Sequence, residues 1–171
     1  MAVFRDGSND YQRLDYALLQ NGSVTLYFRP TFIAKDVEQL KTYGYRIDNF
    51  DCAAWQTVDD MFTAFASTLD FPGYFGRNLD ALNDCLCDID VHKESGRALV
   101  FHRYDAFAAK QPEVAWTVLD IIESNSRLYL LSGKRLLTLV QSDNPQIQFN
   151  GLGAQHANWN RREWLNANRD L

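Results

Sequence analysis

The chain has 171 residues, of which 46% are hydrophobic and 23% charged, and its formal net charge is −5. This composition is typical of a globular protein and excludes a disordered chain. No apolar run is long enough to span a bilayer, and the charged residues among the first 16 positions are not typical of a signal peptide, so we expect a soluble, cytoplasmic protein.

The negative charge lies in the middle of the chain. Residues 44–143 contain 15 acidic and 9 basic residues, whereas residues 1–43 contain five of each, and residues 144–171 contain two acidic and three basic ones. A nucleic-acid-binding protein usually carries a basic surface. We therefore expect no direct nucleic-acid ligand, and instead a basic protein partner that electrostatic attraction brings to the acidic region.

In chain order, the first 43 residues are expected to form a helix over 10–20, a strand over 24–29 and a helix over 34–43. A second strand is predicted over 45–51. After Thr57, which resembles an N-cap with Asp60 three residues later, apolar residues recur at helical spacing.

The second half of the chain repeats this alternation. Strands are predicted over 97–103 and 135–141, and a weaker one over 147–150. One long helix is expected between Pro112 and Gly133, although its last part, SRLYLL, would also suit a strand. At the C-terminus, a short amphipathic helix is expected to begin after Asn160 and to dock Trp159 and Trp164.

Strands separated by long helical crossovers imply a mostly parallel sheet with helices packed on it. The fold class is therefore α/β, with a small sheet flanked by helices. Nothing in the sequence requires a domain boundary, so we expect one domain over residues 1–171. The N-terminal βα unit and a C-terminal strand and helix are expected to widen the sheet.

The segment FPGYFGRNLDALNDCL, residues 71–86, predicts an acidic helix after Asn78. At about 100° per residue, Asp80, Asp84 and Asp88 lie opposite the apolar face. The helix dipole stabilises Asp80 in the first turn. It does not explain Asp84, since each i,i+4 pair of like charges costs about 0.2–0.5 kcal/mol. The row is either a solvated helix face or a surface for a cationic partner.

This segment resembles the barstar family, inhibitors of small basic ribonucleases. The family pattern is a proline, an aromatic pair and a glycine, then Asn-Leu-Asp-Ala-Leu and an aspartate two residues further on. The chain has it from Pro72 to Asp84. With the flanking strands and helices, the resemblance covers about residues 44–143 as a barstar-like core, and it leaves 1–43 and 144–171 outside as extensions.

The resemblance implies a stoichiometric ribonuclease inhibitor whose carboxylates stand in for RNA phosphates, with toxin immunity as one such role. It implies that Asp84 is the central contact, Asp80 a second charge contact, Tyr74 an aromatic anchor and Gly76 the residue that lets the backbone turn. The expected partner-binding residues are Tyr74, Gly76, Asn78, Asp80, Asn83, Asp84 and Asp88.

Two positions depart from the pattern. Asn83 stands where the best-known member has a tryptophan, and Leu128 where an acidic residue is expected, with only Glu123 acidic nearby. We therefore expect weak or no inhibition of the ribonuclease that this member inhibits. Two alternatives stay open: a regulatory or scaffold module that binds another basic protein, or a motif kept for folding alone.

Other chemistry is not indicated. Cys52, Cys85 and Cys87 lack the spacing of a disulfide framework or a zinc site, and the histidines lack a metal-binding motif. Two exposed carboxylates on one convex helix are expected to titrate alike, which does not suit a general acid and base. We expect no enzyme activity, no cofactor and no metal.

Overall fold

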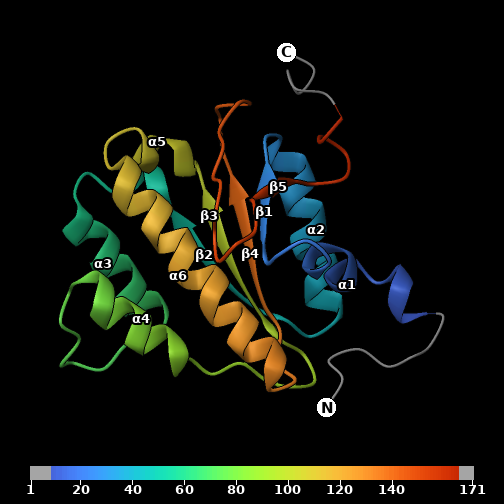
Figure 1. Ribbon diagram of the computed structural model, residues 1–171, viewed down its shortest axis with the longest axis horizontal. Coiled ribbons are helices and arrows are strands. Elements are labelled where there is room, and N and C mark those ends of the chain that lie inside the picture. The colour runs from blue at the N-terminus through green and yellow to red at the C-terminus, as the bar shows by residue number, and fades with distance from the viewer. Residues whose placement is uncertain (1–8, 166–171) are drawn as a thin grey trace.

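The computed structural model describes residues 9–165. Its strands are β1 (Val24–Tyr27), β2 (Arg46–Asp51), β3 (Arg97–His102), β4 (Leu136–Gln141) and β5 (Asn158–Trp159). They form one parallel sheet in the order β2-β3-β4-β1-β5 (Figure 1). The predicted α/β class with a parallel sheet is confirmed. The N-terminal unit widens the sheet by placing β1 beside β4.

Helices cover both faces of this sheet (Figure 1). On one face lie α1 (Leu14–Leu19) and α2 (Pro30–Thr42). On the other lie α3 (Val58–Thr68), α4 (Leu79–Cys87), α5 (Tyr104–Ala108) and α6 (Pro112–Leu131). Short 3-10 turns span Asp10–Gln12 and Cys52–Ala54. No helix of the described part is long and apolar enough to cross a membrane.

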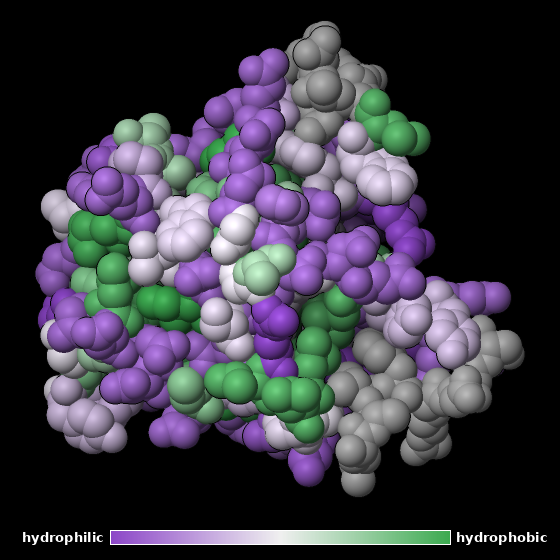
Figure 2. All heavy atoms as spheres, in the orientation of Figure 1, coloured by the Kyte–Doolittle hydropathy of each residue, from purple (hydrophilic) through white to green (hydrophobic). Residues whose placement is uncertain are grey.

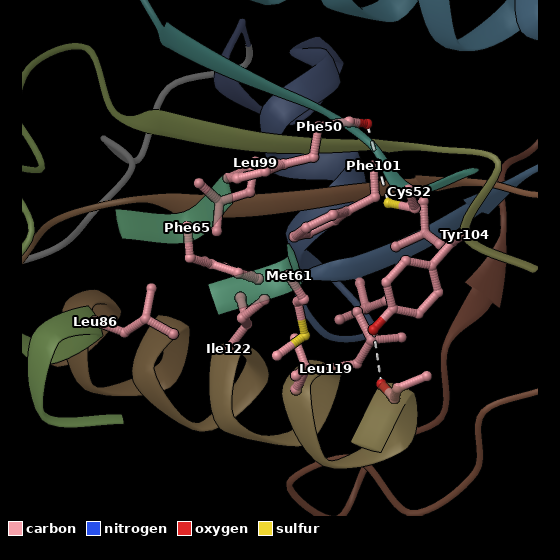
Figure 3. Close-up of a cluster of buried hydrophobic side chains, with 14 of the residues drawn as sticks. Phe50, Cys52, Met61, Phe65, Leu86, Leu99, Phe101, Tyr104, Leu119 and Ile122 are labelled. Carbon is pink, nitrogen blue, oxygen red and sulfur yellow. Dashed lines mark hydrogen bonds between the residues drawn. The ribbon is translucent and has the colours of Figure 1, made fainter. Parts of the chain in front are cut away.

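The larger hydrophobic core lies between the sheet and α3–α6 (Figure 3). The rings of Phe50 on β2 and Phe101 on β3 stack with centroids 4.9 Å apart. The buried hydroxyl of Tyr104 donates a hydrogen bond to the carbonyl of Ala115 at 2.7 Å, which joins α5 to α6. Burying one large apolar side chain contributes about 1.5–3 kcal/mol. This core therefore holds α6, against which α4 packs, firmly on the sheet.

Some predicted boundaries are wrong. Residues 10–20 do not form one helix, because a 3-10 turn precedes α1. The helix predicted over 34–43 begins four residues earlier, at Pro30, since proline fixes a helical φ and lacks an N–H that the first turn would leave unpaired. The short helix α5 was not predicted. The single helix between Pro112 and Gly133 is confirmed.

The strand predicted over 147–150 is also wrong. Phe149 is buried against the core near Tyr104, and its carbonyl accepts a hydrogen bond from the N–H of Ala157. The chain therefore loops back within residues 149–157. Only after this loop does it reach the edge of the sheet, where β5 pairs with Thr25 and Leu26 of β1.

The C-terminal helix predicted after Asn160 is a turn over residues 161–165, and the rest of that prediction lies outside the described residues. Asn160 does receive a hydrogen bond on its Oδ1, from the N–H of Arg162. Trp159 belongs to β5 and packs partly buried against the larger core. Trp164 is 61% exposed, so the predicted docking of both tryptophans is wrong.

Two buried glutamates tie the N-terminal segment to distant parts of the chain. Glu123 of α6 accepts hydrogen bonds from the N–H and hydroxyl of Ser23 at 2.7 and 2.6 Å. Glu163 accepts hydrogen bonds from the N–H groups of Phe28 and Arg29, both at 2.9 Å, where α2 begins. Glu123 therefore cannot supply the acidic contact that Leu128 lacks, because its carboxylate is buried and engaged.

Candidate functional site

The acidic helix α4 begins as predicted. The Oδ1 atom of Asn78 accepts a hydrogen bond from the N–H of Ala81 at 2.8 Å, which confirms Asn78 as the N-cap. An asparagine cap stabilises a helix by about 0.5–2 kcal/mol relative to alanine. Asn78 thus fixes where the helix starts and which side chains point outward.

The turn before α4 depends on Arg77 rather than on Gly76. Arg77 has a φ of 49°, in the left-handed region, whereas Gly76 does not have a positive φ. The left-handed conformation in this turn thus belongs to Arg77, and the role of Gly76 in letting the backbone turn stays a prediction. A Cβ atom on Gly76 would lie 3.2 Å from Nδ2 of Asn78 and 3.3 Å from Cβ of Ala81, so glycine leaves room for a close approach to the first turn of α4.

Arg77 also anchors the loop to α3. Its Nε donates to Oδ1 of Asp59 at 2.7 Å, and its Nη2 donates to Oγ1 of Thr63 at 2.7 Å. Sequence reasoning missed this contact, because Arg77 lies 14 to 18 residues from its partners on α3. The contact holds the loop in one position relative to α3 and α4.

Aromatic packing turns Tyr74 outward. Phe71 and Phe75 lie in contact with each other, with centroids 5.1 Å apart, and Phe75 also packs on Phe62 of α3. Tyr74, between them in the chain, is 87% exposed. The packing of Phe71 and Phe75 thus holds the loop in place while the side chain of Tyr74 extends into solvent. An aromatic anchor of an interface needs such an exposed position.

The carboxylates of Asp80, Asp84 and Asp88 are exposed along α4. Among the residues that the structure describes, none of the three has an ion pair or a side-chain hydrogen bond. Every other aspartate between residues 9 and 165 accepts a hydrogen bond or takes part in an ion pair or another electrostatic contact. The row on α4 is thus held by no ion pair and no side-chain hydrogen bond within the described residues.

A groove of about 440 Å³ runs between the loop and the second half of α4. Tyr74, Asp84, Asp88 and Asp90 contribute to its walls, and the guanidinium of Arg97 lies at its buried side. The Nη2 atom of Arg97 has no hydrogen-bond partner in the described part of the chain. Arg46 also lines the groove, so its walls carry several carboxylates together with the guanidinium groups of Arg46 and Arg97.

The carboxylates also affect the two thiols of α4. Burial raises the pKa of both Cys85 and Cys87, and the negative charges of Asp84 and Asp88 raise these pKa values further. Both cysteines are free and are held in the neutral thiol form near pH 7. The helix surface therefore carries its negative charge on the aspartates alone.

Asn83 does not point freely into solvent. Its Oδ1 accepts a hydrogen bond from Nδ2 of Asn125 on α6 at 2.9 Å, and the thiol of Cys87 donates to Oδ1 of the same Asn125 at 2.9 Å. Asn83 thus joins α4 to α6, a role that sequence reasoning missed. Its predicted contact with a partner stays a prediction, as do those of the other named residues. Leu128 is 59% exposed on α6.

Between residues 9 and 165, no group of three or more histidine, cysteine, aspartate or glutamate side chains could hold a metal ion. What the site offers is an anchored helix with exposed hydrogen-bond acceptors, an outward tyrosine and a shallow groove. Such a surface is prepared to bind a cationic partner without first ordering its own side chains.

Comparison with known proteins agrees with this geometry. A family model described as Barstar (barnase inhibitor) matches residues 45–141, which is more than half of the chain. A search of curated proteins finds no match. The matched region contains the loop, α4, the groove and α6. It leaves β1, β5 and the helices α1 and α2 outside.

Proposed function

The chain belongs to the barstar family, and we propose that it is a stoichiometric, non-catalytic inhibitor of a basic ribonuclease. In this proposal α4 enters the active site of the enzyme, and its carboxylates occupy the positions that RNA phosphates take. The negative charge of residues 44–143 draws the enzyme in, and the anchored loop beside α4 fixes the approach.

The observation that carries the proposal is the row of Asp80, Asp84 and Asp88, none of which has an ion-pair partner in the described part of the chain. Three carboxylates at i,i+4 spacing repel one another, which costs stability. A partner that supplies arginine, lysine or protonated histidine side chains removes this repulsion and gains charge-assisted hydrogen bonds. Asp84 lies in the middle of the row and lines the groove, so it makes the central contact.

Tyr74 supplies the second part of the contact. An exposed, rigidly based aromatic side chain is a typical anchor of a tight interface, because it buries a large area while losing little conformational entropy. The enzyme surface that meets Tyr74 lies next to the surface that meets Asp84, since both residues line the same groove. A toxin nuclease would be one such enzyme, and the chain would then act as its immunity protein.

The test is a titration of ribonuclease activity. We would use purified small ribonucleases with isoelectric points above about 9, with barnase among them. We expect full inhibition of at least one of them at a one-to-one ratio, and weak or no inhibition of barnase. Asn83 is engaged with Asn125, and Leu128 is not acidic, so two contacts of the best-known member are missing.

The matched variants are Asp84→Asn and Glu38→Gln. Each removes one negative charge, but Glu38 lies on α2, which covers the opposite face of the sheet. We expect Asp84→Asn to weaken inhibition by about 2 kcal/mol or more and Glu38→Gln to leave it nearly unchanged. If no ribonuclease binds and another basic protein does, the protein is a regulatory or scaffold module. Equal losses from both variants would contradict the placement of the interface on α4.

A further inference from the structure

Two leucines are exposed at the end of α6, beside the acidic helix. Leu128 is 59% and Leu131 is 81% exposed. They are three residues apart, so their side chains are neighbours on one side of the helix. Figure 2 shows hydrophobic side chains gathered toward this lower end of α6. Single exposed leucines are ordinary on a protein surface, but a pair next to a binding surface calls for an explanation.

These leucines are continuous with α4. A depression of about 230 Å³ lies between the two helices, lined by Cys87 on one side and by Asn125, Leu128 and Tyr129 on the other. The hydrogen bonds of Asn125 to Asn83 and Cys87 fix the two helices against each other. Tyr129 is also fixed, because its single hydroxyl hydrogen lies among three main-chain carbonyl oxygens at and just after the end of α4, each within hydrogen-bond distance.

The charge of the surface changes across this boundary. On α4 the exposed charged side chains are carboxylates. The depression is lined by a neutral thiol, an amide, a leucine, a phenol and a hydroxyl, with Lys134 at its edge. A second row of cations on a partner would find no acceptor of full charge among these lining residues. An apolar side chain would find Leu128 and the wall of the depression.

The size of a stable interface requires the contact to extend beyond α4. Specific complexes bury about 800 Å² on each partner, from roughly 20–30 residues. The row of aspartates and Tyr74 supply only part of that area. Toward α3 the neighbouring surface contains the charged pair of Arg77 and Asp59. Toward α6 it contains Leu128 and Leu131, which can be desolvated without separating an ion pair.

We propose that Leu128, Leu131 and the adjoining depression form an apolar subsite for the ribonuclease itself. The inference rests on the proposed function. It states that the partner carries an aliphatic or aromatic side chain on the rim of its basic cleft, and that this side chain packs against Leu128 while the cleft receives α4. The subsite selects among basic ribonucleases, since all of them attract α4 but only some carry an apolar group at this place.

The experiment uses the panel ribonuclease that the full chain binds most tightly, and measures the dissociation constant for Leu128→Gln, Leu131→Gln and Leu128→Glu. Glutamine has a helix propensity similar to that of leucine, so folding should be kept. The control is Leu165→Gln, because Leu165 is 88% exposed and lies in the C-terminal segment. We expect at least tenfold weaker binding for Leu128→Gln, a further loss for Leu128→Glu, and less than a twofold change for the control.

Several outcomes would overturn the subsite. Tighter binding by Leu128→Glu would mean that this position faces a cation. Unchanged binding by both glutamine variants, with a loss for Asp84→Asn, would reject the subsite and leave the proposed function intact. Lower stability to urea in the glutamine variants would mean that the chain itself covers the leucines, and loss of a concentration-dependent dimer would mean that a second copy does. If no enzyme of the panel binds the parent, both proposals fail.

Discussion

The aspartates of β2 and of α4 have opposite surroundings. Asp48 on β2 is 5% exposed, and its Oδ2 lies 2.5 Å from Nε of Arg97, which is itself 1% exposed. Asp84 on α4 is exposed and has no ion pair or side-chain hydrogen bond among the described residues. Arg97, the partner of Asp48, also lines the groove that Asp84 borders. An aspartate that the fold uses is paired within the chain, and an aspartate that the fold does not use is available to a partner.

The largest expected effect comes from breaking the buried pair. Asp48→Ala would leave the guanidinium of Arg97 buried without its carboxylate, which costs about 3–5 kcal/mol. Urea denaturation should show this loss in the free energy of unfolding. A loss below about 1 kcal/mol would mean that water or another group replaces the carboxylate, and the contrast with Asp84 would then weaken.

The next effect concerns the start of α4. Asn78→Ala removes the acceptor of the Ala81 N–H and should lower the free energy of unfolding by about 0.5–2 kcal/mol. Ribonuclease binding should weaken as well, because the same helix turn positions Asp80. Asn78→Ser, which retains a capping oxygen, is the control and should recover most of both losses. If serine recovers stability but not binding, Asn78 contacts the partner directly.

The exposed row should behave in the opposite way. Asp84→Ala removes the two repulsive i,i+4 pairs that Asp84 makes with Asp80 and Asp88. Each such pair costs about 0.2–0.5 kcal/mol. We expect stability that is unchanged or slightly higher at low salt, with the gain fading as salt screens the charges. Thermal unfolding at two ionic strengths measures it. A destabilisation comparable to that of Asp48→Ala would show that Asp84 serves the fold after all.

The smallest effect is a pH dependence. Burial raises the pKa of Cys87, and the charges of Asp84 and Asp88 raise it further. Asp88→Asn should therefore lower this pKa, increase the thiolate fraction at pH 8.5 and speed alkylation by iodoacetamide, with little change at pH 6.5, where the thiol stays protonated. Glu38→Gln, on the other face of the sheet, should not change the rate. Equal rates for parent and Asp88→Asn would mean that the charge of Asp88 does not contribute to the pKa of Cys87.

The elements with local signals could be predicted from the sequence. The strands from β1 to β4, the cap at Thr57 and the cap at Asn78 each follow from a few adjacent residues, and the structure confirms them. The outward face of α4 followed from helical periodicity in the same way. These features need no knowledge of what lies across the fold.

The features that were missed depend on contacts between distant residues. Asn83 reads as an exposed position from periodicity, yet it bonds Asn125, which is 42 residues away. Glu123 reads as a surface acid, yet it is buried against Ser23, 100 residues away. The short strand β5 forms only because the preceding loop places residues 158–159 beside β1, where they pair with Thr25 and Leu26. No local pattern encodes such pairings, so they emerge only in the folded chain.

The position of β1 also determines the order in which the protein can assemble. β1 is synthesised before the other four strands of this sheet, but its neighbours β4 and β5 are synthesised after the other two. The acceptor for the N–H groups of Phe28 and Arg29 is Glu163, which follows them by 135 and 134 residues. Such long sequence separations slow folding. The region from β2 to α6 can begin to pack during synthesis, whereas β1 must wait until β4 or β5 has been made before it can pair.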